Sequence, residues 1–481
     1  MKYRNLAIIS IILLAVVGIA FSNFEFKEKR YHQHLEAKVR PENVVTTDEF
    51  ATHLPIIDIK TEAAMPPSFK ERKDESGEII KERNYDVVKS SVKYIQNEDT
   101  ENKRGDTPVF TTNAYIRTRG ASSRNFEKKG YWIEFKNDDF SKNRDIEIDG
   151  MVADSDWVLH GPYLDKTLIR NYLCYNIAGE FMDYSPNVRF CELFINDEYR
   201  GLYLLTEKIK YNKDGRVNIT KTDPKMSKTS YIIKMDRPIN DKKYRVIGLF
   251  ESMEELYAKY ERVMEILYPN ETLTEKQRNS IEKDIIKVEK AIISRNIVDR
   301  NDGYKSYIDV DSFVDYYILN EFTANADATT VSTYLYKDIR GKIKLITWDH
   351  NSSFDNYEFG DIMDRIIFDT SWWYKYLLKD EYFTNKVIDR YKYLRKNVLS
   401  DEYLMNYIDE TIEYLGPAID RNYKRWPNAL KFDNLKPKER NQHSHDEAIG
   451  YLKNAIKRRG AYLDKNIDTL KGLSHKSMIK K

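Results

Sequence analysis

The chain has 481 residues, of which 32% are charged, yet its formal net charge is only +2 and its mean hydropathy is −0.68. Interspersed acidic and basic residues at near-zero net charge exclude the global basic signature of a nucleic-acid-binding protein. With only Cys174 and Cys191, a disulfide framework and a cysteine metal site are excluded as well, and we expect both thiols to be buried.

The amino terminus departs from this composition. Residues 6–21 (LAIISIILLAVVGIAF) carry no charge and follow two basic residues. A membrane-spanning helix needs about 20 apolar residues, whereas the apolar core of a secretory signal has about 7 to 15. The bulky Phe21 and Phe24 favour an interfacial anchor, although Gly18 and Ala20 offer a weak cleavage site. We therefore expect residues 1–24 to be an uncleaved membrane anchor, with a cleaved signal and a secreted form as the alternative, and the following domain to lie outside the cytoplasm.

The first half of the chain is predicted to be rich in β-strands. Residues 25–54 are expected to form a membrane-proximal linker, and a strand begins after Pro55. The charge-rich segment 67–84 is expected to be a loop or hairpin. Further strands are predicted at 107–118, 130–136, 189–196, 200–209 and 230–235, from alternating apolar residues or from β-branched residues. One helix is predicted at 166–182, with Asp165 as its cap.

The second half is predicted to be mostly helical. Residues 251–298 have a helical pattern broken at Pro269, and Asp311 can cap a helix that ends at Phe322. A hairpin is expected from strands 332–336 and 342–347, and helices at 371–425 and 446–470. We expect an α+β fold with two lobes and a cleft between them. The predicted divisions are the anchor 1–24, the linker 25–54, a β-rich N-lobe 55–235, a helical insertion 236–300, a helical C-lobe 301–470 and a basic tail 471–481.

Two basic clusters in the β-rich half are candidate phosphate-binding residues. Residues 117–124 (RTRGASSR) join two strands and combine three arginines, a glycine and two serines. Guanidinium groups, hydroxyls and backbone amides bind phosphate, although a plain basic surface turn has the same composition. Lys128 and Lys129 precede the next strand and could reach a nucleotide phosphate; the alternative is a solvated strand end.

Two acidic segments in the second half are candidate catalytic and metal-binding residues. Asp327 lies in a polar loop after a helix, and Asp349 follows 22 residues later, with a hairpin between them. Protein kinases place a catalytic aspartate and a Mg²⁺-binding aspartate in this order. The side chains of Asp349 and Asn351 offer the hard oxygen ligands that Mg²⁺ prefers. Turn-forming aspartates without catalytic function are the alternative.

At these positions the sequence resembles the spore coat protein H (CotH) kinase-like family of atypical protein kinases. The resemblance covers roughly residues 85–470. The matching stretches are RTRGASSRNFEKKGYWIEF (117–135), DWVLHGPYLDKTLIRNYL (156–173), ELFINDEYRGLYLLTEKI (192–209), YIIKMDRP (231–238), FVDYYILNEFTANADATTVSTYLYKD (313–338) and KLITWDHNSSFDN (344–356). The resemblance implies a two-lobed protein-kinase-like fold that uses ATP and Mg²⁺.

The resemblance also implies roles for individual residues. The catalytic residue is Asp327, and the metal ligands are Asp349 and Asn351. The nucleotide-binding residues are Arg119, Gly120, Ser122, Lys128, Lys129 and Glu207, the last near the expected adenine site. The supporting residues are Asp165, Arg170, Asn325 and Ser332.

Three positions differ from the family pattern. A basic residue often stands where this chain has Thr330, and a second acidic residue often stands at Asn351. Ser332 occupies the place of the usual Mg²⁺-binding asparagine of a kinase catalytic loop, and serine is a poorer ligand. These differences leave both a weak kinase and a pseudokinase open.

The main hypothesis is an ATP- and Mg²⁺-dependent kinase that phosphorylates Ser or Thr of an envelope protein, or of a spore-coat protein if the organism sporulates. The alternative is a membrane-tethered structural scaffold without catalysis, and a third hypothesis is a hydrolase of phosphorylated envelope material. No nucleic-acid partner is expected. The cluster His443, His445 and Asp446 could bind a metal, but we expect a polar loop before a helix.

Overall fold

The computed structural model describes residues 30–44, 49–73, 78–212, 217, 219–237, 263–294, 297, 302–329 and 331–475. The chain divides into two compact units, Met1–His32 and Gln33–Lys481, and the second unit contains the sheets and helices that carry the candidate site residues. The predicted anchor, residues 1–24, lies outside the described residues. Within the described ranges, no helix combines the length and apolarity needed to cross a membrane.

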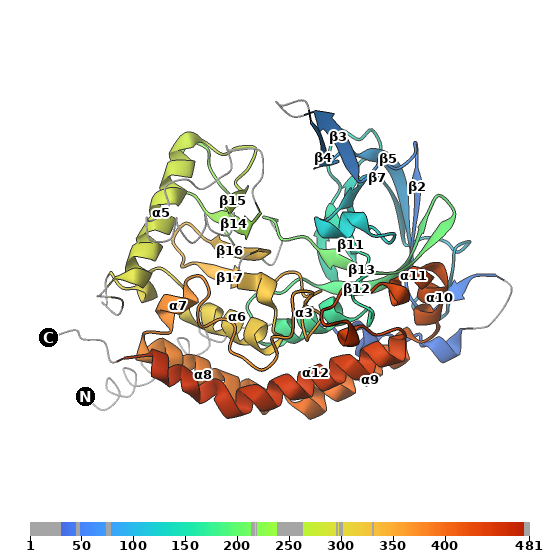
Figure 1. Ribbon diagram of the computed structural model, residues 1–481. Helices are drawn as coiled ribbons and strands as arrows, with labels where there is room; N and C mark the ends of the chain where they lie inside the picture. Colours follow the sequence, from blue (N-terminus) through green and yellow to red (C-terminus); the bar gives the residue numbers. More distant parts are fainter. Residues whose placement is uncertain are drawn as a thin grey trace, which may run out of the picture. The chain divides into compact units, whose positions relative to one another are not determined.

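A closed seven-stranded barrel forms the first half of this second unit (Figure 1). Its strand order is β11-β13-β12-β2-β5-β7-β8. The bounds are β2 Ile56–Thr61, β5 Val88–Ile95, β7 Phe110–Arg119, β8 Gly130–Lys136, β11 Asp156–His160, β12 Val188–Ile195 and β13 Glu198–Glu207. All neighbouring pairs are antiparallel except β12 and β2, which are parallel.

Side chains along β7 alternate between the core of the barrel and its outer face. Ala114 and Ile116 are fully buried inside, whereas Arg117 and Arg119 on the opposite face are only half-buried. This period-2 pattern is what a strand with one core face requires. It leaves Arg119 at the end of β7 on the outer face.

Other parts of the barrel half follow the predictions closely. The segment 67–84 forms a separate hairpin of β3 (Phe69–Lys73) and β4 (Ile79–Arg83). Helix α3 (Arg170–Phe181) packs against β12, and its residues are almost all buried. Cys174 on α3 and Cys191 on β12 are buried, as predicted, and both are free thiols.

A second, four-stranded sheet has the order β15-β14-β16-β17. Its strands are β14 Tyr231–Asp236, β15 Val263–Tyr268, β16 Thr333–Lys337 and β17 Lys344–Ile346. The predicted hairpin is therefore confirmed as β16 and β17, each within a residue or two of its expected ends. The strand predicted at 230–235 joins this sheet by pairing with β16.

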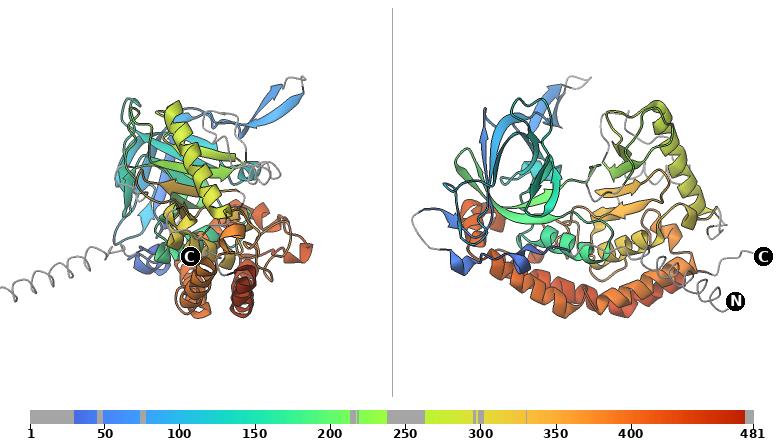
Figure 2. Two further views of the ribbon diagram at one scale, coloured as in Figure 1. Left: turned by 90° about the vertical axis from the view of Figure 1, so that its left-hand side faces the viewer. Right: turned by 180° about the vertical axis from the view of Figure 1, so that it is seen from behind.

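Helix α5 lies along one side of this sheet, α6 and α7 lie below it, and α8, α9 and α12 run beneath both halves of the unit, as the views from the front and from behind agree (Figures 1 and 2). Their bounds are α5 Glu275–Ile293, α6 Val310–Phe322, α7 Tyr374–Leu377, α8 Glu381–Arg395, α9 Asp401–Leu415, α10 Pro417–Arg425, α11 Pro427–Lys431 and α12 His445–Asn466. The α+β class, with a β-rich first part and a helical carboxyl-terminal part, is thereby confirmed.

Three local predictions are wrong. Residues 263–268 were expected to be helical but form β15, because Met264 and Ile266 are buried when the segment pairs with β14. Helix α6 is capped by Asp309, which accepts a hydrogen bond from the Ser312 amide at 3.0 Å, and not by Asp311. Helix α3 begins at Arg170, so Asp165 precedes the capping position.

Candidate active site

The loop after β17 carries Asp349 and Asn351. Asp349 has a φ of +59°, a left-handed backbone conformation that is uncommon for a residue other than glycine. Its backbone amide donates to the Tyr175 hydroxyl on α3 at 3.0 Å. The side-chain nitrogen of Asn351 donates to Oδ1 of Asp349 at 2.6 Å. The two residues predicted to bind metal therefore contact each other directly.

Helix α3 holds this loop from the barrel side. The Asn171 side chain accepts from the His350 amide at 2.7 Å and donates to Oδ1 of Asn351 at 3.2 Å. Arg170 donates to the Ser353 carbonyl at 2.9 Å and to the Phe354 carbonyl at 3.3 Å. These bonds fix the backbone on both sides of Asn351.

Asp165 in turn fixes Arg170. The two side chains form a fully buried ion pair at 2.6 Å, and Oδ2 of Asp165 accepts from the Arg170 amide at 2.9 Å. A buried guanidinium needs such a partner because an unpaired buried charge is strongly destabilising. The predicted supporting pair therefore orients the Asp349 loop through two carbonyls of that loop.

Asp327 lies in the short 3-10 helix η5 (Ala326–Thr329), directly after α6. The Ser352 hydroxyl donates to Oδ2 of Asp327 at 3.3 Å. Two residues before Asp327, the Asn325 side-chain amide donates to the Asp349 carbonyl at 3.2 Å. The predicted catalytic and metal-binding segments are thus joined by two cross-contacts, and Asn325 takes part in one of them.

The two carboxylates share an electrostatic environment that disfavours negative charge. Burial raises the pKa of Asp327 to about 6, and the nearby charge of Asp349 adds to the rise. Burial also raises the pKa of Asp349, with Asp236 contributing in the same direction. Among the described residues, neither Asp327 nor Asp349 forms an ion pair, so a divalent cation would relieve this repulsion.

Arg119 is the cation that acts on Asp349, whereas Arg237 acts on Asp327. The charge of Arg119 opposes the rise in the pKa of Asp349, and its guanidinium lies 5.7 Å from the centre of the Trp348 ring. No ion pair engages Arg119 within the described ranges. At Gly120, which has a φ of +107°, a Cβ atom would lie 1.9 Å from the Ser123 hydroxyl, so only glycine fits here. Ser122 is exposed in the following 3-10 turn, Ser122–Asn125.

The two predicted phosphate-binding lysines are engaged elsewhere. Lys128 is 1% exposed and donates to the Leu202 carbonyl at 2.6 Å and to the Asn422 side chain at 2.7 Å. Burial lowers the pKa of Lys128 to about 7. Lys129 donates to the Arg124 carbonyl at 2.8 Å. Neither lysine contacts Asp327 or Asp349 in the part of the chain that the structure describes.

Glu207 also has no contact with Asp327 or Asp349 among the described residues. It accepts from the backbone and side-chain amides of Asn187, at 2.8 and 3.0 Å. It lines a small polar hollow that Asp154, Asp156 and Lys210 also line. Ser332 has a φ of +53° directly before β16, and Thr330 lies outside the described residues.

Three residues that complete the site were not among the predicted ones: Asn171, Asp236 and Ser352. Each lies within a family-like stretch, in LIRNYL, KMDRP and DHNSS respectively. Asn171 directly follows Arg170, and Ser352 directly follows Asn351. For Asn171 and Ser352 this adjacency was the available signal, whereas Asp236 had none. Only the tertiary structure shows the hydrogen bonds of Asn171 and Ser352 and the effect of Asp236 on the pKa of Asp349.

The donor set suits Mg²⁺ with few protein ligands. Asp349 and Asn351 supply a carboxylate and an amide oxygen, and Asp327 lies beside them. No group of three His, Cys, Asp or Glu side chains that could hold a metal occurs among the described residues. Mg²⁺ commonly takes one or two carboxylates and completes its shell with water and substrate phosphates. Asp349 and Asn351 fit that pattern by residue type, although in this structure Oδ1 of Asn351 accepts from Asn171 and its NH2 group donates to Asp349.

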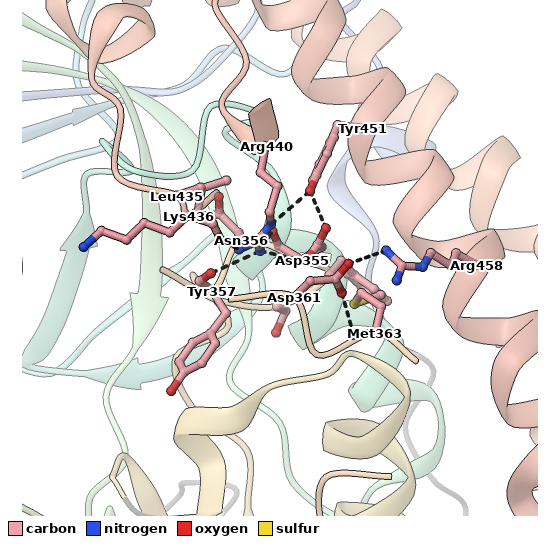
Figure 3. A network of polar contacts seen from close by, with 12 residues as sticks. Asp355, Asn356, Tyr357, Asp361, Met363, Leu435, Lys436, Arg440, Tyr451 and Arg458 are labelled. Carbon is pink, nitrogen blue, oxygen red and sulfur yellow. Dashed lines mark hydrogen bonds and ion pairs between the residues drawn. The ribbon is translucent and has the colours of Figure 1, made fainter. Parts of the chain in front are cut away.

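Arginines from the carboxyl-terminal segment hold the continuation of the Asp349 loop (Figure 3). Arg440 and Asp355 form a buried ion pair at 2.7 Å, and the Tyr451 hydroxyl also donates to Asp355. Arg440 donates further to the carbonyls of Asp355 and Tyr357, at 2.9 and 3.1 Å. Arg458 pairs with Asp361 at 2.7 Å. The loop beyond Asp349 and Asn351 is therefore fixed in place.

Comparison with known proteins agrees with the resemblance. The family model described as CotH kinase protein matches residues 116–463. Inner spore coat protein H of Bacillus subtilis (strain 168) is 24% identical over 363 residues, which cover 74% of this chain and 87% of that protein. The matched family range begins within β7 and includes every candidate site residue.

Proposed function

Since the chain belongs to the CotH kinase family, we propose that it is a protein kinase that transfers the γ-phosphoryl group of ATP, with Mg²⁺, to Ser or Thr of a protein acceptor. The two-lobed kinase-like arrangement is part of this proposal. The observation that carries it is the pair of half-buried carboxylates, Asp327 and Asp349, whose pKa values are both raised and whose segments are joined by hydrogen bonds from Ser352 and Asn325. Neither carboxylate forms an ion pair with another described residue.

In this proposal each residue has a separate task. Asp327 orients the acceptor hydroxyl and accepts its proton as the new oxygen–phosphorus bond forms and ADP leaves. Asp349 and Asn351 would hold Mg²⁺, which when bound neutralises charge on the phosphates. Arg119, without an ion-pair partner in the described part of the chain, balances negative charge on the phosphoryl group.

The acceptor is proposed to be a spore-coat protein or another envelope protein. The support is the likeness to inner spore coat protein H, whose name places that protein in a spore coat. A membrane tether through residues 1–24 is a further part of the proposal, supported by the apolar sequence alone.

One experiment tests the catalytic proposal. Purified protein is incubated with γ-phosphate-labelled ATP, Mg²⁺ and candidate coat proteins, beside Asp327→Asn and the exposed control Asp99→Asn. Label on an acceptor with the wild type and with Asp99→Asn, but not with Asp327→Asn, supports the kinase. Equal labelling by all three proteins contradicts the role of Asp327.

A scaffold without catalysis is the second candidate. The observation that favours it is the use of both Lys128 and Lys129 in internal hydrogen bonds. A thermal-shift assay separates the two functions, because ligand binding stabilises a folded protein by mass action. No shift at millimolar ATP and Mg²⁺ would favour the scaffold.

A further inference from the structure

A chain of side-chain hydrogen bonds leads from the candidate metal ligands back to the barrel. The side-chain nitrogen of Asn351 donates to Oδ1 of Asp349 at 2.6 Å, and Oδ1 of Asn351 accepts from Nδ2 of Asn171 at 3.2 Å. The same Nδ2 atom lies 3.0 Å from Nε2 of His160, the last residue of β11. His160 is therefore connected to Asn351 through one intervening side chain.

One backbone amide fixes the direction of these hydrogen bonds. The His350 N–H donates to the Asn171 side chain at 2.7 Å, so the Asn171 atom that it meets is the oxygen Oδ1. The nitrogen Nδ2 then faces the other two partners and has one proton for each of them. Because Nδ2 can only donate, Nε2 of His160 must accept. The imidazole is therefore neutral and carries its proton on Nδ1.

The surroundings of His160 agree with a neutral ring. Burial lowers the pKa of His160 to about 4, and the charges of Arg119 and Lys128 act in the same direction. Asp165 and hydrogen bonding to Asn351 oppose this change without reversing it. At neutral pH the ring therefore offers an acceptor to the amide beside it.

Strand β11 holds His160 at this place. Trp157 is buried among residues of the barrel, whereas Val158 packs in the hydrophobic cluster that contains residues of α3. Alternation along the strand puts His160 on the same face as Val158. At Gly161 a Cβ atom would lie 2.7 Å from the Lys129 carbonyl oxygen, so only glycine fits directly after the histidine. The barrel therefore presents His160 to α3 at a fixed position.

We propose that His160 is a positioning residue for the proposed Mg²⁺ site. By accepting from Asn171, it completes the hydrogen bonds of the amide that holds Oδ1 of Asn351. That oxygen has two lone pairs, so it can accept from Asn171 and still ligate a cation. The inference rests on the proposed function and adds a residue through which the barrel orients the metal ligands.

Loss of the acceptor would disturb the metal ligands through Asn171. Asn171 is buried, and a buried N–H group without a partner is unfavourable. The Asn171 amide would turn toward another acceptor, and Asn351 would lose the hydrogen bond that holds its oxygen. Groups that orient a metal ligand in this way commonly change metal affinity about 10- to 100-fold when they are replaced.

The test follows thermal unfolding of the full chain during titration with Mg²⁺, with and without ATP. His160→Phe keeps an aromatic ring but removes the acceptor, and it should need about 10- to 100-fold more Mg²⁺ for half of the rise in unfolding temperature. His160→Gln places an oxygen at a similar distance from the backbone as Nε2, so its Mg²⁺ midpoint should stay close to that of the wild type. A role in folding alone would lower the unfolding temperature without Mg²⁺ and leave the midpoint unchanged.

A second comparison shows whether His160 acts through Asn171. Asn171→Ala should raise the Mg²⁺ midpoint, and adding His160→Phe should raise it no further, because both substitutions break the same chain of contacts. If His160→Phe does not fold, His160→Asn takes its place, since its shorter side chain does not reach Asn171. Independent effects of the two substitutions would overturn the inference.

The outcomes separate this inference from the proposed function. An unchanged Mg²⁺ midpoint in His160→Phe overturns the inference, while labelling of a coat protein by the wild type leaves the kinase intact. Equal losses of Mg²⁺ affinity in His160→Phe and His160→Gln also overturn it, because the acceptor would not be the cause. If the wild type shows neither labelling nor a thermal shift with ATP and Mg²⁺, the kinase proposal fails and the inference fails with it.

Discussion

The side-chain amide of Asn351 donates to Oδ1 of Asp349 at 2.6 Å. Burial raises the pKa of Asp349, and this hydrogen bond from a neutral group partly offsets the rise. This contact explains how the loop tolerates Asp349 without an ion pair in the described structure. It also gives Asn351 a structural role in addition to the proposed metal contact.

Replacing Asn351 with Asp should make the fold dependent on a divalent cation. The new carboxylate would repel Asp349 and lose the hydrogen bond, so the unfolding temperature should fall without metal and recover with millimolar Mg²⁺. The double variant Asn351→Asp/Asp349→Asn restores a single negative charge and serves as the control. A metal-independent unfolding temperature in Asn351→Asp would contradict the placement of Mg²⁺ here.

Removing the charge of Asp327 should stabilise the protein and abolish transfer. The folded-state pKa of about 6 lies above the ordinary 3.8, so the folded protein binds more protons between these values and loses stability as pH rises through them. In Asp327→Asn the asparagine cannot ionise, so the variant does not lose this stability. It should therefore unfold at a higher temperature than the wild type at pH 7.5. Its rate of phosphoryl transfer should fall about 10²- to 10⁴-fold. An unchanged rate would refute the role as base.

The same pKa predicts the pH profile of the free enzyme. A base must be unprotonated, so kcat/KM should fall as pH drops below about 6. Saturating Mg²⁺ should move the inflection to lower pH, because a nearby cation favours the carboxylate. A profile that is flat from pH 5 to 8 would argue against Asp327 as the titrating group.

Arg440 and Arg458 hold the same loop but should differ greatly in their contribution to stability. Arg440→Ala leaves the buried Asp355 without its cation and should cost about 3–5 kcal/mol of the free energy of unfolding. Arg458 is 42% exposed in its pair with Asp361, and Arg458→Ala should cost about 1 kcal/mol or less. Denaturant unfolding measures both. Similar losses of unfolding free energy in the two variants would contradict a larger contribution from the buried pair of Arg440 and Asp355.

Lys128 should make stability rise with pH. The unfolded chain has the ordinary lysine pKa of 10.5 while burial lowers the folded-state pKa to about 7. The unfolded state therefore binds more protons between pH 7 and 10, and the folded state gains stability as pH increases through this window. In Lys128→Met this gain should disappear from the difference between unfolding free energies at pH 7 and 9. If the unfolding free energy of Lys128→Met still rises with pH as in the wild type, Lys128 is not the titrating group.

Several features of the fold could be predicted from local sequence. The strands at 130–136 and 189–209, the hairpin at 332–347 and the end of α6 at Phe322 follow from side-chain periodicity and turn residues, which act over a few positions. The strand at 263–268 did not follow, because its pairing with β14 outweighs its helical pattern.

The candidate site also has features that the sequence predicts and others that only the packing shows. The order of Asp327, hairpin and Asp349 was visible in the sequence, because the residues that connect them are a short, locally encoded hairpin. The partners of Lys128 were not visible: Leu202 and Asn422 meet it only because α10 packs on β13. Sequence alone thus determined which residue types could carry the chemistry. The tertiary structure decided which of them face the carboxylates, because hydrogen bonds between distant segments depend on how helices and strands pack.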